Sequence, residues 1–249
     1  MRLKDKVAIV TGSSRGIGRA IAVAMAKEGA KVVVNGENQA VMAEMDETVA
    51  LIKEFGGEVI SVKADIADYQ QVGMLAQETI NAFGRVDILV NNAGITRDGM
   101  LHKMSVHQWN EVININLNGV FNCTRVVGAM MRNQRSGNII NISSVVGLYG
   151  NVGQTNYSAT KGAVISMMKT WAKELGGKGI RSNAIAPGFI ATEMVEAMPE
   201  AVLDKIKKSV PMGRLGTAEE IANVAVFLSS DEASYINGEV IRVDGGLYT

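Results

Sequence analysis

The sequence has only one cysteine, Cys123, only two histidines and no excess of either charge. A single cysteine excludes an internal disulfide and any site built from several cysteines. The 25 basic residues balance the 25 acidic ones, whereas a protein that binds nucleic acid by neutralising phosphates normally carries a basic excess. His102 and His107 do not have the spacing of the zinc motif H-E-x-x-H. We therefore expect no metal site and no nucleic-acid partner.

Long apolar runs are also missing. The uncharged stretch 112–124 is interrupted by four asparagines, and a membrane-spanning helix needs about 20 mainly apolar residues. Four of the first six residues are charged, and they lead directly into a strand-like segment, unlike a signal peptide. We expect a soluble, cytoplasmic protein without a membrane partner.

What is present is a hydrophobic fraction of 47% in 249 residues, enough for a large core and too much for a disordered chain. Short apolar runs alternate with longer segments of helical periodicity. The runs predict strands at 7–10, 31–34, 58–62, 86–90, 138–142, 180–185 and 239–243. The periodic segments predict helices at 17–25, 40–55, 68–83, 105–131, 156–175 and 218–228.

Strands without polar alternation, each followed by a helix, indicate a parallel sheet that is covered on both faces. Right-handed crossovers make it doubly wound. With no low-complexity linker and no repeat, the sequence predicts a single-domain, Rossmann-like α/β fold over residues 1–249. A ligand in such a sheet binds beyond the carboxyl ends of the strands, where the strand order reverses.

The loop at 11–18 leaves the first strand and enters the first helix. Its glycines, Gly12, Gly16 and Gly18, are spaced four and then two residues apart. They would aim a helix N-terminus at a pyrophosphate, although an ordinary strand-to-helix turn has about even odds from the glycines alone. The same segment fits G-x-S-x-G, the nucleophile elbow of serine hydrolases, with Ser14 as nucleophile. That alternative is poor, because the acid would have to lie between Ser14 and the two histidines.

A second group of polar residues comprises Ser144, Tyr157 and Lys161. Tyr157 and Lys161 are four residues apart on a predicted helix, hence on one face. An ammonium close to a phenol favours the phenolate, so we expect a lowered Tyr157 pKa and a general acid or base that works nearer neutral pH. A surface pair with a partly buried ring is the alternative that this spacing alone would favour.

Taken together, the motifs resemble the short-chain dehydrogenase/reductases over nearly the whole chain. They are Thr11-Gly12-x-x-x-Gly16-x-Gly18, Asn91-Asn92-Ala93-Gly94, Ser144, Tyr157-x-x-x-Lys161 and Pro187-Gly188. The segments 187–192, 211–216 and 237–246 look like those of the branch that reduces 3-oxoacyl groups on acyl carrier protein. The segment 153–158 is similar to the acetoacetyl-CoA reductases of the same branch.

The resemblance implies four catalytic residues. Tyr157 would protonate the keto oxygen, Lys161 would hold the nicotinamide ribose and lower the Tyr157 pKa, and Ser144 would bind the substrate oxygen. Asn116 would hold a water that passes protons to Lys161, with Asn114 two residues away as the competing choice. Without the resemblance, Asn116 would be interpreted as an amide inside a helix that bonds to backbone groups.

The resemblance also implies the residues that bind the cofactor. NADP(H) is preferred, because the position of the family's carboxylate falls on Gly36 and Arg15 could reach a phosphate. Glu37 could instead bind a ribose hydroxyl, so NAD(H) is the alternative. Asp65 could cap a helix rather than bind the cofactor. The expected binding residues are Gly12, Ser14, Arg15, Gly16, Ile17, Gly18, Asp65, Ile66, Asn92, Ala93, Gly94, Tyr157, Lys161, Pro187, Gly188, Ile190 and Thr192.

The implied reaction is reduction of a 3-oxoacyl thioester to the (R)-3-hydroxyacyl product. The thioester would be carried by acyl carrier protein, docked at Arg135 and Lys178, or by coenzyme A. A lid around 189–213, with Met194, Met198 and Val202, would cover the substrate, although ordinary helix packing explains these residues equally well. A homotetramer is expected, with the tail Leu247-Tyr248 compatible with burial in a neighbour. A related alcohol, steroid or sugar dehydrogenase is the alternative.

Overall fold

The seven strands in the described part of the chain form one parallel sheet. The computed structural model describes residues 1–192, 195 and 200–248. The sheet order is β3-β2-β1-β4-β5-β6-β7, and every neighbouring pair is parallel. The order reverses between β1 and β4, which confirms the doubly wound Rossmann-like fold. The strands are β1 (Val7–Val10), β2 (Lys31–Gly36), β3 (Val59–Lys63), β4 (Ile88–Asn91), β5 (Gly137–Ile142), β6 (Ile180–Pro187) and β7 (Val240–Val243).

Helices connect the strands as the periodicity predicts. Ser105 caps α4 with a reciprocal pair of bonds to Gln108, and Asp68 caps α3. The α-helices are α1 (Gly16–Lys27), α2 (Met42–Lys53), α3 (Tyr69–Phe83), α4 (Val106–Ile113), α5 (Val120–Gln134), α6 (Val146–Tyr149), α7 (Thr155–Gly176), α9 (Glu200–Ser209) and α10 (Ala218–Ser229). Three short helical segments are η1 (Gln39–Val41), η2 (Asn114–Gly119) and η3 (Asp231–Ala233).

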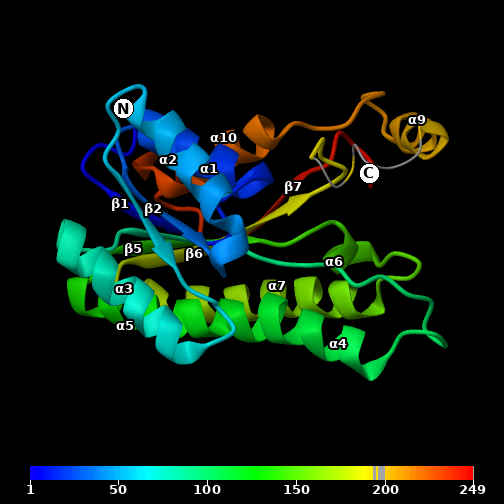
Figure 1. The fold of residues 1–249 in the computed structure, drawn as a ribbon, viewed down its shortest axis with the longest axis horizontal. Helices are drawn as coiled ribbons and strands as arrows, with labels where there is room; N and C mark the ends of the chain where they lie inside the picture. The colour runs from blue at the N-terminus through cyan, green and yellow to red at the C-terminus, as the bar shows by residue number, and fades with distance from the viewer. Residues whose placement is uncertain (193–194, 196–199, 249) are drawn as a thin grey trace.

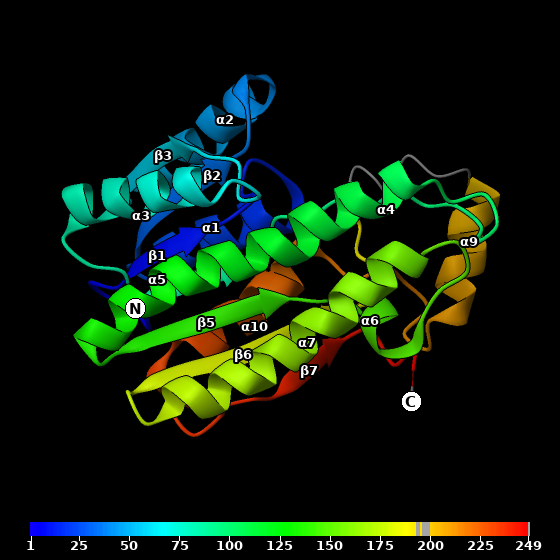
Figure 2. The same ribbon diagram turned by 90° about the horizontal axis from the view of Figure 1, so that it is seen from below.

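The helices form a layer on each face of the sheet. Figure 1 shows α1, α2 and α10 above the strands and α3, α5 and α7 below them. Figure 2, from below, shows α5 and α7 running along the sheet and α4 continuing the line of α5. Two apolar clusters fill the space between the layers. One lies between the sheet and helices α1 and α10, and the other lies between the sheet and helices α3 and α5. The inner strands β1, β2, β4, β5 and β6 are buried along almost their whole length, as their apolar sequence pattern requires, whereas the edge strands β3 and β7 are partly exposed.

The segment predicted as one helix over 105–131 departs from a regular α-helix. Residues Asn114–Gly119 form a π-helical turn between α4 and α5, and such turns occur frequently at functional sites. The sequence also did not predict α6 or α9. The latter lies within the expected lid, where Val202 is exposed. Met194 and Met198 of that lid lie outside the described residues.

Among the helices that the structure describes, none combines the length and the apolar composition needed to cross a bilayer.

Candidate functional site

A cavity of about 640 Å³ opens where the strand order reverses, the place where ligands bind in doubly wound sheets. Its volume is within the usual range for sites that bind small molecules and cofactors. All residues that the sequence assigned to a dinucleotide line it, from the glycine loop at one end to Pro187, Gly188, Ile190 and Thr192 at the other. Ser144, Tyr157 and Lys161 line the same cavity.

Several lining residues were not among those predicted. Four of them, Asn35, Ala64, Ile142 and Ser143, lie at or directly after the ends of β2, β3 and β5, a position that the predicted strands could have indicated. One is Asn35, a buried residue whose side chain accepts from Gly12 N and donates to the carbonyls of Val62 and Ala64. It therefore holds the glycine loop against β3. The others are Val41, Ala64, Ile95, Thr96, Ile115, Ile142, Ser143 and Val195.

Two glycines of the loop, Gly12 and Gly18, leave no room for a side chain. Gly12 has a φ of +60°, and a Cβ there would lie 2.8 Å from the Cα of Ala93. At Gly18 a Cβ would lie 2.2 Å from the carbonyl oxygen of Gly12. Asn92 fixes the same turn, because its side-chain amide donates to the carbonyls of Thr11 and Gly12. At Gly12 and Gly18 the backbone of the loop therefore packs directly against Asn92 and Ala93 at the cavity.

The first turn of α1 adds an electrostatic feature to this part of the cavity. Its N-cap is Arg15, which makes no side-chain cap bond, and the turn contains no acidic residue. The first N–H groups of a helix lack intrahelical partners and attract anions. An uncapped helix start beside the glycine loop fits the pyrophosphate of a dinucleotide.

At the other end of the cavity, Lys161 of α7 is buried against the end of β5. Its ammonium donates to the carbonyl of Ile142 at 2.7 Å and lies 5.5 Å from the ring centroid of Tyr157. Ser143 Oγ donates to the carbonyl of Lys161, and Ser144 Oγ accepts from Val146 N. The end of β5 thus holds the serine, the tyrosine and the lysine together.

The Tyr157 pKa is the point at which the sequence-based expectation is wrong. Burial raises the pKa of Tyr157 to about 12, a hydrogen bond with Ser144 works in the opposite direction, and the Asp98 charge adds to the increase. Desolvation of the phenolate is the largest of these contributions. Burial also lowers the pKa of Lys161 to about 8. At neutral pH the phenol keeps its proton.

The π-helical turn places Asn116 beside the catalytic end. Asn116 is fully buried, and its amide accepts from Ile95 N at 2.8 Å and donates to Ile95 O at 2.9 Å. A Cβ on Gly94 would lie 3.2 Å from Asn116 Oδ1 and 3.6 Å from Lys161 Nζ, so this glycine separates the amide from the ammonium. Asn114 faces outward, where it accepts from Asn118.

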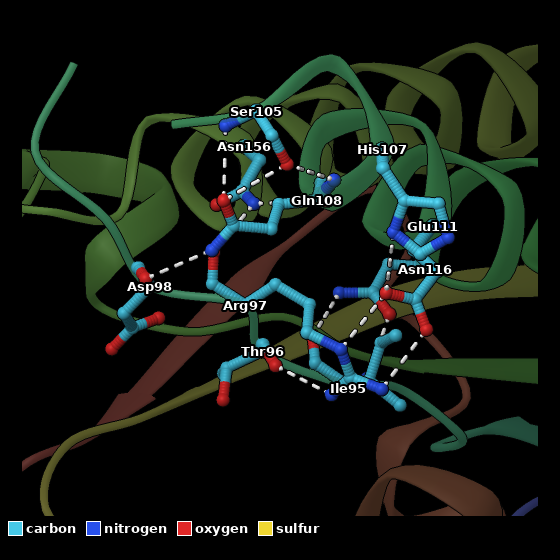
Figure 3. A network of polar contacts seen from close by, with 10 residues as sticks. All are labelled: Ile95, Thr96, Arg97, Asp98, Ser105, His107, Gln108, Glu111, Asn116 and Asn156. Atoms are coloured by element: carbon cyan, nitrogen blue, oxygen red, sulfur yellow. Dashed lines mark hydrogen bonds and ion pairs between the residues drawn. The ribbon is translucent and has the colours of Figure 1, made fainter. Parts of the chain in front are cut away.

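Figure 3 shows how the segment that follows Gly94 is held to α4 and α7. The amide of Asn156 donates to the carbonyls of Arg97 and Gln108, and Gln108 Nε2 donates to Asp98 O. The guanidinium of Arg97 makes two bonds to Glu111, which also pairs with His107. This network fixes one wall of the cavity through backbone contacts.

Charged groups surround the cavity end near β2. Arg15 Nη1 lies 3.4 Å from Glu44 Oε1, and Ser14 Oγ donates to Glu44 Oε2 at 3.0 Å. Glu37 lines the cavity beside Gly36. The pKa of Arg97 is raised by its hydrogen bond with Glu111, and the more distant charge of Glu37 contributes in the same direction. Both signs of charge are therefore present here.

The geometry does not favour a serine hydrolase. Ser14 donates to a carboxylate, and no histidine is among the described residues that line the cavity. In the part of the chain that the structure describes, no group of three or more histidine, cysteine or acidic residues is arranged to hold a metal ion.

Comparison with known proteins adds an independent finding. Residues 12–248 match the family described as enoyl-(acyl carrier protein) reductase. The chain is 47% identical over 247 residues to a 3-oxoacyl-(acyl-carrier-protein) reductase of Thermotoga maritima, with 99% of each chain covered. Proteins with this name from Staphylococcus epidermidis and Synechocystis are 47% and 49% identical, and each comparison covers 98% of this chain.

The chain belongs to the short-chain dehydrogenase/reductase family. Membership makes this protein an oxidoreductase and implies a nicotinamide cofactor, in agreement with the resemblance found in the motifs. The glycine loop and the uncapped start of α1 are compatible with that cofactor.

Two predicted features of this short-chain dehydrogenase/reductase lie outside the cavity. Arg135 and Lys178 precede β5 and β6, at the edge of the sheet opposite to the cavity, and Gly179 lies against the carbonyl of Arg135. The tail residue Tyr248 stacks on Tyr149 of its own chain, with ring centroids 4.1 Å apart. Arg242 contacts both tyrosines. The tail thus packs beside α6, which follows Ser144.

Proposed function

We propose that this short-chain dehydrogenase/reductase reduces a 3-oxoacyl thioester to the (R)-3-hydroxyacyl thioester. The main support is the grouping of Ser144, Tyr157 and Lys161 in the same cavity as the glycine loop. The names of relatives that match over nearly the full length point to a 3-oxoacyl substrate.

A nicotinamide dinucleotide, when bound, supplies the hydride that adds to the keto carbon. The chain's own residues would supply the rest. Tyr157 would donate its phenolic proton to the keto oxygen, and a raised pKa suits this role because the phenol is fully protonated at neutral pH. Ser144 would bind the same oxygen. Lys161, protonated below its pKa of about 8, would hold a ribose and stabilise the tyrosinate after proton transfer.

Asn116 would act at a greater distance from the substrate. Its amide is occupied by both backbone groups of Ile95, so its first effect is to fix the segment beside Gly94. We propose that a water near Asn116 returns protons to Lys161 between turnovers, because the amide oxygen keeps one lone pair after its bond with Ile95 N, and both this oxygen and Lys161 Nζ lie close to Gly94.

We propose NADP(H) as the preferred cofactor and NAD(H) as the alternative. Gly36 offers no carboxylate to a ribose hydroxyl, and Arg15 lines the cavity near it. Glu37 opposes a 2′-phosphate. Initial rates with each cofactor decide the question, and a large preference for NADH would contradict this choice.

The acyl group would be presented by acyl carrier protein or by coenzyme A. Within one chain, Arg135 and Lys178 lie at the amino ends of β5 and β6, whereas the cavity lies at the carboxyl ends of the strands. A carrier docked at this pair would therefore have to serve the cavity of another copy in the proposed homotetramer. Reversal of both residues to Glu should slow the carrier-bound substrate more than the coenzyme A substrate. Equal effects on the two substrates would refute docking at this pair.

We also propose that the chain is one domain in which residues 189–213 cover the substrate. Ile190, Thr192 and Val195 line the cavity at the start of this segment. Acetoacetyl-CoA together with the dinucleotide should slow proteolysis within 189–213, and an unchanged cleavage rate would contradict the proposal.

The deciding experiment for the function is reduction of acetoacetyl-CoA with NADPH and with NADH. Tyr157→Phe should abolish the reaction, whereas Ser14→Ala should leave most of it. The reverse pattern would favour a hydrolase. Faster turnover of steroids, sugars or simple alcohols would favour another dehydrogenase of the family.

A further inference from the structure

Glu44 on α2 contacts two residues of the cavity wall without lining the cavity itself. Its carboxylate accepts from Ser14 Oγ at 3.0 Å and lies 3.4 Å from Arg15 Nη1. The Glu44 side chain is 32% exposed, so solvent only partly screens its charge. The two groups best placed to bind a phosphate at this end therefore share a carboxylate.

The position of Glu44 is fixed by a polar seam between α2 and the glycine loop. Arg19 donates to the carbonyls of Ser14 and Glu44, and Thr48 Oγ1 donates to the carbonyls of Ser13 and Ser14. Arg19 also pairs with Glu47 on the outer side of α2. Because several buried bonds set the register of α2 against the loop, Glu44 cannot move far from Ser14.

A second carboxylate reinforces the negative charge. Glu37 lines the cavity next to Gly36, where a ribose substituent would lie if the dinucleotide binds as proposed. A 2′-phosphate brings about two negative charges, whereas a 2′-hydroxyl brings none and can donate to a carboxylate. Of these two ribose substituents, the carboxylate of Glu44 repels only the phosphate, and it also competes with the phosphate for Ser14 and Arg15.

We propose that Glu44 is a specificity-determining residue that weakens binding of NADP(H) relative to NAD(H) by engaging Ser14 and Arg15. This inference rests on the proposed use of a nicotinamide dinucleotide. The inference deepens the cofactor assignment. Arg15 attracts a 2′-phosphate less strongly while it is paired with Glu44 than it would if that carboxylate were absent.

The test is binding of NADPH and NADH, measured by fluorescence titration on the full chain without substrate. Glu44→Gln keeps the shape of the side chain and one of its two acceptor oxygens but removes its charge. We expect the Kd for NADPH to fall about tenfold at low salt, the Kd for NADH to change less than about twofold, and the difference to shrink in 0.5 M salt. Glu47→Gln is the matched control, since Glu47 is on the same helix and pairs with Arg19 instead.

Parallel shifts of both dissociation constants, or no shift for NADPH, would overturn the proposal. A second measurement keeps the result interpretable if Glu44→Gln disturbs folding. In Glu44→Asp, which retains the charge, the ratio of the two dissociation constants should stay near that of the wild type. A wild-type chain that binds neither dinucleotide would overturn the proposed function as well, whereas failure of Glu44 alone would leave that function intact.

Discussion

The two ends of the cavity solve different physical problems. At the catalytic end, Asn116 and Lys161 are buried, and each makes short bonds to backbone groups. At the end near β2, Arg15, Glu37 and Glu44 keep part of their charge in solvent. Buried polar groups are costly to disturb and shift their pKa values, whereas exposed pairs contribute little stability and respond to salt. The catalytic end is thus built for fixed geometry, and the other end for charge selection.

The largest effect should come from Tyr157→Phe, because it removes the proton donor and leaves the ring. Reduction of acetoacetyl-CoA should fall by roughly 10²- to 10⁴-fold, while the Kd for NADPH stays within about twofold. Tyr149→Phe is the control, since this tyrosine lies beside α7 on α6 and stacks on the tail. Loss of dinucleotide binding in Tyr157→Phe would show that the two ends do not act separately.

Lys161→Met tests the burial of the ammonium through pH. The folded pKa of about 8 lies below the usual 10.5, so between these values the unfolded chain binds a proton that the folded chain has lost. Stability of the wild type should therefore rise from pH 8 toward pH 10.5 by up to about 3 kcal/mol relative to Lys161→Met. Denaturant unfolding at pH 7.5 and 9.5 measures this difference.

Loss of the bond to the Ile142 carbonyl would change the free energy of unfolding of Lys161→Met by the same amount at both pH values. The pH-dependent part is therefore the informative one. A difference that does not change with pH would mean that the ammonium is not desolvated in the folded chain.

Asn116→Ala should cost about 1 to 3 kcal/mol of unfolding free energy, because it leaves the half-buried N–H and C=O of Ile95 without the partners that the Asn116 side chain provides. The turnover number should also fall, since Ile95 follows Gly94 at the cavity. Asn114→Ala, two residues away and exposed, should change neither quantity. Similar losses of stability and turnover in Asn116→Ala and Asn114→Ala would contradict a specific role for Asn116 in the π-helical turn.

The smallest effect is expected at the end near β2. Glu47→Gln breaks the exposed ion pair with Arg19 and should change the free energy of unfolding by less than about 1 kcal/mol. A loss as large as that of Asn116→Ala would contradict the contrast between the two ends. Thermal unfolding at low and high salt provides the comparison.

The sequence predicts the cavity well because its residues follow strands. Glycine spacing, apolar runs and the Tyr157-x-x-x-Lys161 spacing are local patterns, and a parallel sheet brings the strand ends to one edge. The choice of Asn116 over Asn114 came from the family resemblance, and the structure places Asn116 inside and Asn114 outside. The π-helical turn that orients them has no comparable local pattern.

What the sequence missed depends on contacts between distant segments. The wrong direction of the Tyr157 pKa followed from counting the neighbouring ammonium without the desolvation of the phenolate. The partner of Arg15 and Ser14 is on α2, about 30 residues away. The stacking of Tyr248 on Tyr149 likewise joins the end of the chain to α6, and no short-range pattern predicts it.

The most direct test of the whole account is a crystal structure of the chain with a bound nicotinamide dinucleotide. We predict the pyrophosphate on the loop of Gly12, Gly16 and Gly18 and the nicotinamide beside Tyr157 and Lys161. A nicotinamide bound away from Tyr157, or a pyrophosphate that does not touch the glycine loop, would contradict the account.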